Sequence, residues 1–160
     1  MSIRTLLLAT ALAAAATPAL AADPFCDALN KLVAAAEEED PFASQKVGGS
    51  DGMFGVRDPV PGFRPSVCSI ANMGFEFGQG PSAFCRQTLA PPELNGRDLA
   101  AEVMRCTGAD IEPNPARQYE VSFLIRGVIV RIEESGTDRG KVGRSVGLIV
   151  RRAGPADHAD

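Results

Sequence analysis

The sequence has no tryptophan, one tyrosine (Tyr119) and one histidine (His158). Catalytic devices of the Ser-His-Asp or Cys-His kind need a positioned imidazole, and His158 lies near the end of a short polar tail. Sugar-binding sites commonly stack the sugar ring on Trp or Tyr. These shortages argue against both a nucleophilic triad and a sugar-stacking platform.

Cysteine is scarce but even in number: the chain has Cys26, Cys68, Cys85 and Cys106. No C-x-x-C pair occurs and the histidine is remote, so we expect no metal site. An even number of cysteines behind an export signal predicts disulfides formed in an oxidising compartment. Three pairings are open, and we favour the most local one, Cys26–Cys68 with Cys85–Cys106. All four thiols are then consumed, which leaves no cysteine nucleophile.

Residues 1–22 have the pattern of a secretory signal peptide. Arg4 gives a positive start, Leu6–Ala16 is an apolar run, and Ala19-Leu20-Ala21 is a small-residue cleavage site. The run is shorter than the ~20 apolar residues that a membrane-spanning helix needs, and no later stretch is long enough. We therefore expect cleavage near Ala21/Ala22, no transmembrane segment, and a periplasmic or secreted product.

The remaining chain has the composition of one globular domain, since 45% of all residues are hydrophobic and 22% are charged. We expect a single α+β domain over residues 23–152 and a disordered tail over 153–160. The predicted order is α-β-β-β-β-α-β-β, an antiparallel sheet packed against two α-helices.

Two helices are predicted from capping signals. Asp23-Pro24 is a typical helix start, and an apolar stripe runs from there to Ala36 before Pro41 stops the helix. The second helix is predicted over Gly96–Thr107, with Asn95 as its cap and Gly108 as its terminator.

The stretch Tyr119–Arg152 predicts a hairpin, because two alternating runs rich in β-branched residues flank the polar loop Glu133–Lys141. Its first run changes phase: apolar residues occupy odd positions up to Ile125 and even positions from Val128. Arg126-Gly127 lies at the change. It indicates either a β-bulge or a strand covered on both faces, and both interpretations stay open here.

Charge is divided between the two halves. Residues 23–113 hold seven Lys and Arg against 14 Asp and Glu, for a net charge of −7, whereas residues 114–160 hold eight against six, for +2. The basic residues gather on the last hairpin. They form either a solvated rim or a surface that binds an acidic protein partner through Arg126, Arg131, Arg144 and Arg151. The isoelectric point of about 5.1 argues against nucleic acid. The opposite charges of the halves would also suit a homodimer.

A second candidate surface is apolar. Met73, Phe75 and Phe77 alternate with polar or small residues and are flanked by glycines. The pattern suits a stripe of the core, or a hydrophobic groove for an apolar ligand or peptide.

These observations favour an exported, periplasmic, non-catalytic binding or adaptor protein without a cofactor. One alternative is an inhibitor or immunity-type protein that blocks a toxin or lytic enzyme with the acidic Glu37–Asp40 or the glycine-rich Gly48–Gly52 loop. The other is a carboxylate-based hydrolase, because acids are abundant and such an enzyme needs only two of them.

Overall fold

The computed structural model describes residues 23–72, 80–109, 119–136 and 143–154. Its helices are α1 (Pro24–Ala36) and α2 (Gly96–Thr107), with single 3-10 turns at Ala43–Gln45 and Pro65–Val67. Its strands are β1 (Lys46–Ser50), β2 (Met53–Val56), β3 (Cys68–Asn72), β4 (Pro81–Thr88), β5 (Tyr119–Ile125), β6 (Val128–Ser135) and β7 (Ser145–Arg152).

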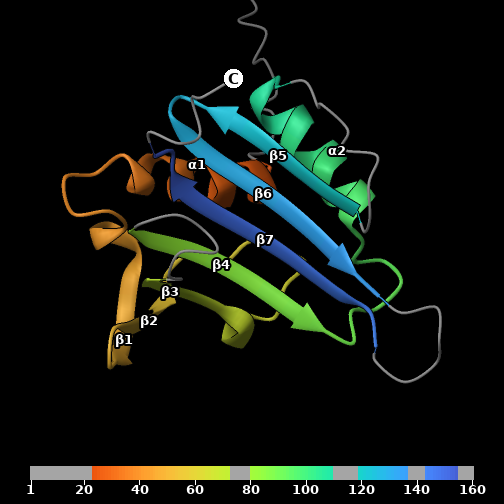
Figure 1. The fold of residues 1–160 in the computed structure, drawn as a ribbon, viewed down its shortest axis with the longest axis horizontal. Helices are drawn as coiled ribbons and strands as arrows, with labels where there is room; N and C mark the ends of the chain where they lie inside the picture. Colours follow the sequence, from red (N-terminus) through yellow and green to blue (C-terminus); the bar gives the residue numbers. More distant parts are fainter. Residues whose placement is uncertain (1–22, 73–79, 110–118, 137–142, 155–160) are drawn as a thin grey trace, which may run out of the picture.

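The described strands form one sheet in the order β1-β2-β3-β4-β7-β6-β5, and all neighbours are antiparallel. The sheet consists of two meanders, β1 to β4 and β5 to β7, joined where β7 pairs with β4. Figure 1 shows α1 and α2 together on one face of the sheet. The α+β class is confirmed, and the predicted order was one strand short.

Helix α1 starts as its capping signal predicts. The Asp23 carboxylate accepts hydrogen bonds from the N–H groups of Phe25 (2.9 Å) and Cys26 (3.2 Å). The helix ends at Ala36, before the acidic run that was expected to belong to it. Arg152 closes this end, since its guanidinium donates to the carbonyls of Ala36 (3.1 Å) and Glu38 (2.5 Å). A cation from the last strand therefore satisfies carbonyls that a helix leaves without partners.

Helix α2 has the predicted bounds. The Asn95 side chain accepts from the N–H of Asp98 at 2.9 Å, and Gly108, at φ 68°, donates to the Met104 carbonyl at 2.8 Å. A carboxylate from the sheet adds to this start, because Glu134 accepts from the N–H of Gly96 at 2.7 Å.

The change of phase at Arg126-Gly127 is a two-residue hairpin turn, so both the β-bulge and the doubly covered strand were wrong. Both residues have positive φ, 51° and 77°, as the turn that fits the twist of a hairpin requires. The turn pairs Ile125 with Val128 and Phe123 with Val130, so odd positions of β5 lie opposite even positions of β6. The apolar residues of both strands thereby share one face.

This shared face packs against the helices to form the core. The last three strands contribute Val121, Phe123, Val128, Val130, Ile132, Val146, Leu148 and Val150, all buried. From α1 come Leu29, Leu32 and Val33, and from α2 come Leu99 and Val103. The last strand ends at Arg152, and Ala153 after it donates to the Gly127 carbonyl at 2.8 Å. Residues 155–160 lie outside the described chain.

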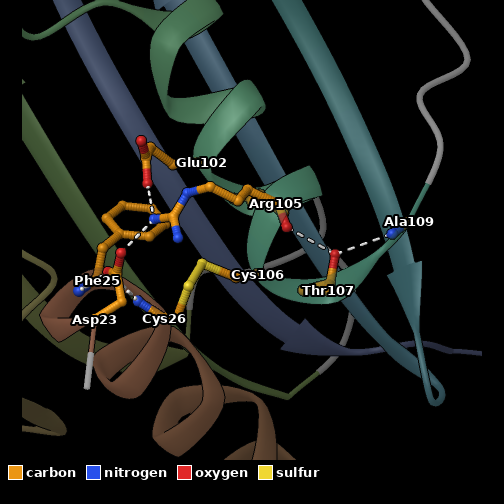
Figure 2. Close-up of a disulfide and its surroundings, with 9 residues drawn as sticks. Asp23, Phe25, Cys26, Glu102, Arg105, Cys106, Thr107 and Ala109 are labelled. Atoms are coloured by element: carbon orange, nitrogen blue, oxygen red, sulfur yellow. Dashed lines mark hydrogen bonds and ion pairs between the residues drawn. A yellow bond between two sulfur atoms is a disulfide. The ribbon is translucent and has the colours of Figure 1, made fainter. Parts of the chain in front are cut away.

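Two disulfides are present, and the expected pairing was wrong. Cys68 and Cys85 lie directly opposite each other on β3 and β4, with Cα atoms 4.0 Å apart. Cys26 joins Cys106 across the two helices, with Cα atoms 5.1 Å apart (Figure 2). Proximity along the chain was a poor guide because strand register and helix packing decide which cysteines meet.

The two disulfides are expected to stabilise the fold unequally. Their sequence separations are 80 and 17 residues. Loop-closure entropy gives about 4.5 kcal/mol for the longer loop and about 3 kcal/mol for the shorter. Urea unfolding of the Cys26→Ser/Cys106→Ser and Cys68→Ser/Cys85→Ser variants measures both losses. Equal losses, or a larger one for the strand pair, would contradict this order.

Candidate functional site

The face of the sheet opposite the helices carries a cluster of charged side chains. The strand register aligns Glu120 of β5, Glu133 of β6, Gly147 of β7 and Arg86 of β4 in one row, with Arg131 two residues before Glu133 on the same face of β6. We call Arg86, Glu120, Arg131 and Glu133 the outer-face cluster.

Ion pairs connect the outer-face cluster into a chain of alternating sign. Arg131 binds Glu120 at 2.9 Å and Glu133 at 2.8 Å, and Glu133 also binds Arg86 at 2.8 Å. Glu120 and Glu133 lie opposite each other on neighbouring strands, an arrangement that repels unless a cation bridges it. Arg131 supplies that bridge.

Gly147 lies between Arg86 and Glu133 in the register. An added Cβ would stand 3.8 Å from the Arg86 side chain, in ordinary contact. With no side chain at this point, the cluster borders a polar depression of about 250 Å³ that Ser135 and Ser145 also line.

The charges of this site remain partly open to water. The exposed fraction of the side chain is 47% for Arg86 and 43% for Glu120, against 29% for Arg131 and 21% for Glu133. Exposed ion pairs of this kind contribute little stability, ~1 kcal/mol or less each. Their outer atoms can instead exchange partners with charged groups of another molecule.

The structure divides the four arginines that were expected to form one basic surface. Arg131 belongs to the outer-face cluster. Arg126 lies at the β5–β6 turn, 61% exposed, with Glu37 3.8 Å away. Arg151 lies on the outer face of β7, where it donates to the carbonyl of Arg152 at 3.2 Å.

Arg144 has a structural role. Its guanidinium lies 3.2 Å from the Glu134 carboxylate and donates to the carbonyls of Pro91 and Leu94, the latter at 2.8 Å. It thereby fixes the loop that leads into α2. The single basic surface was therefore wrong, because one of its four members is used to hold the fold together.

The apolar candidates Met73, Phe75 and Phe77 lie outside the described residues, as does the expected signal peptide over 1–22. Both stay predictions. Of the outer-face cluster, the sequence identified Arg131 alone. The alternation of Glu120 on one strand with Arg131 and Glu133 on the next was a signal for the others, whereas Arg86 is distant in sequence and only the strand order brings it close.

A second charged cluster lies beside the helix disulfide (Figure 2). Arg105 of α2 binds Asp23, the cap of α1, at 2.6 Å, and also contacts Glu102 of its own helix. Hydrogen bonding from the Cys26 N–H, followed by the bond from Arg105, lowers the pKa of Asp23 below its ordinary value of 3.8. The cluster joins the two helices next to Cys26–Cys106, and we assign it to stability. Of its members, Glu102 also lines an open depression of about 250 Å³ between α2 and the Pro61-Gly62 turn.

Comparison with protein-family models, curated proteins and solved structures gave no match to this chain. In the part of the chain that the structure describes, no helix is long and apolar enough to cross a membrane, and no group of three His, Cys, Asp or Glu residues is placed to hold a metal ion. The two disulfides are consistent with an extracellular or periplasmic location.

The Asp23 cap predicts a pH-dependent stability. A carboxyl whose pKa is lower in the folded state stabilises the fold above its unfolded pKa, and this stabilisation is lost as the pH falls through the folded value. Asp23→Asn keeps a capping oxygen and removes the charge. We expect it to unfold more easily than the parent at pH 7 and equally easily well below pH 3.8.

Urea unfolding between pH 7 and pH 2 measures the difference, with Asp51→Asn at the exposed β1–β2 turn as the matched control. A deficit in Asp23→Asn that persists unchanged at pH 2 would show that the charge is not its cause.

Proposed function

We propose that this chain is an exported, non-catalytic binding protein that holds a protein partner against the outer face of its sheet. The observation that carries the proposal is the outer-face cluster: four ion-paired side chains of alternating sign around a polar depression, on the face that α1 and α2 leave uncovered. Residues that serve only to keep a sheet soluble have no need of so regular an arrangement.

The chemistry of the cluster indicates what the partner presents. Arg86 and Arg131 offer guanidinium groups to acidic side chains, and Glu120 offers a carboxylate to a basic one. A partner with both signs of charge therefore fits better than a purely acidic one. Binding of this kind steers association and sets specificity, and it weakens as salt screens the charges.

The test is capture from an envelope extract of the producing organism on the immobilised mature chain. The parent is expected to retain one stoichiometric protein, released by raising the salt concentration. Arg86→Glu and Arg131→Glu should reduce capture at least tenfold, because each places a third acid in the outer-face cluster. Arg64→Glu is the matched control, since Arg64 is exposed outside the cluster and its N–H bonds to the buried Gln87. Equal capture by all four proteins, or by none, would refute the proposal.

A second candidate function is inhibition of a toxin or lytic enzyme, and one observation favours it. The β1–β2 hairpin lies at the end of the sheet (Figure 1) and exposes Val47 (36%) and Met53 (53%) next to its Asp51-Gly52 turn. The acidic alternative, Glu37–Asp40, is tied to the body of the protein: Glu38 accepts from the Ser44 N–H at 3.0 Å, and Asp40 binds Lys46 at 3.0 Å.

Co-expression with exported lytic enzymes tests this second function. If the hairpin inserts into an enzyme, Val47→Asp/Met53→Asp abolishes protection of the cells, because charged groups replace the apolar contact. Arg86→Glu should leave the protection intact. Protection that the hairpin variant retains, or no protection by the parent, would remove the candidate.

A further inference from the structure

The two edges of the sheet are built differently. At one edge β1 is short and irregular: Gly48 and Gly49 have positive φ, and its pairing with β2 shifts between Val47 and Ser50. At the other edge β5 is regular, and each of its seven residues pairs in register with β6. It contains no proline, glycine or lysine. Irregular edges resist pairing with other chains, whereas a regular edge is a template for it.

The open side of β5 has hydrogen-bonding groups to offer. In a two-residue hairpin the residues flanking the turn bond each other, so Ile125 and the other odd positions direct their N–H and C=O groups to β6. The even positions Glu120, Ser122 and Leu124 direct theirs away from the sheet. These outward backbone groups have no hydrogen-bond partner in the described structure.

The side chains along this edge are also accessible. Leu124 is 55% exposed and Ser122 is exposed, although a leucine in a strand is more usually covered. The strand is charged at both ends and with opposite signs: Glu120 near its start, and Arg126 in the turn that follows it. Arg126 is 61% exposed, and its pair with Glu37, at 3.8 Å, is loose.

We propose that β5 pairs with β5 of a second copy of this chain, antiparallel and centred on Phe123, so that two sheets become one continuous sheet. In this register Ser122 lies opposite Leu124 of the second copy, and each of the two such pairs exchanges two backbone hydrogen bonds, about four in all. Glu120 lies opposite Arg126 of the second copy at both ends. The partner is the same chain because the strand is complementary to itself in this direction.

Other arrangements of the same edge are less favourable. A parallel, in-register pairing would place Glu120 against Glu120 and Arg126 against Arg126, with like charges at both ends. The antiparallel arrangement also continues the core, since Val121 and Phe123 of both copies fall on the helix-covered face. On α2, Ala101 is exposed on the side of the helix away from Cys106, and Met104 on the same side is half-buried against the core.

The oligomeric state of the mature chain tests the inference, measured by light scattering after size exclusion and by sedimentation at several concentrations. The parent is expected to have twice the monomer mass. Ser122→Pro removes an outward N–H that is not bonded to β6, and Leu124→Lys places on the edge a lysine, a residue that discourages pairing with another strand. Each should raise the dimer dissociation constant at least tenfold. Met53→Lys, a similarly exposed residue of the β1–β2 hairpin at the other end of the sheet, is the matched control.

Circular dichroism and thermal melting of each variant establish that it is folded. A monomeric parent at ~100 µM, or a dimer that both Ser122→Pro and Leu124→Lys leave intact, would overturn the inference. Disruption by Met53→Lys alone would place the interface at the other end of the sheet and overturn it as well. Ser122 lies opposite Arg131 of the outer-face cluster, whereas Leu124 lies opposite Ile129, which is outside it. Leu124→Lys is therefore the variant that separates the two proposals: it should lose the dimer and keep capture of a partner through Arg86 and Arg131.

Discussion

The pairing of β7 with β4 is the contact on which the rest of the structure depends. The first meander, β1 to β4, and the second, β5 to β7, each have one apolar face and too few strands to cover two helices. Their joint aligns Ala83 with Val150 and Cys85 with Leu148, and it makes one continuous apolar surface. Since β7 is the last strand in sequence, the sheet is complete only when the end of the described chain is in place.

Charged side chains of the second half hold elements of the first half in place. Arg152 closes the carboxyl end of α1, and Arg144 holds the Pro91–Leu94 loop. In the reverse direction, Glu134 of the second half accepts from the first N–H of α2. Several of these groups bond to backbone carbonyls and N–H groups that helix ends leave unsatisfied. Charged residues of the second half of the sequence thus supply contacts that hold the two halves of the chain together.

The two faces of the sheet have different physical demands. The helix-covered face is fixed by packing, and the Cys26–Cys106 and Cys68–Cys85 bonds secure it in an oxidising compartment. The opposite face carries an ordered chain of ion pairs, next to the buried Ile149 and Ser82. The two edges of the sheet also differ, since β5 is regular and β1 is irregular. Together they describe a scaffold with two proposed contact surfaces, a sheet face and a sheet edge.

Local rules were sufficient for much of this fold. Capping residues set the start of α1 and both ends of α2, and alternation located the strands of the last hairpin. They failed at Arg126-Gly127. Arginine is uncommon at a left-handed turn position, so the change from odd to even apolar positions did not indicate a turn. Because this turn was not predicted, β5 and β6 were predicted as one strand, and the predicted order was one strand short.

The sequence by itself determined the fold class, the helices, the number of cysteines available for pairing and the charge of each half, because these depend on neighbours along the chain. Only the tertiary structure decided which cysteines bond, which arginines hold the fold, and that Arg86 stands beside Glu133, 47 residues away. Those outcomes follow from strand order and register, and the insertion of β7 between β4 and β6 is set by the burial of a whole apolar face rather than by any local pattern.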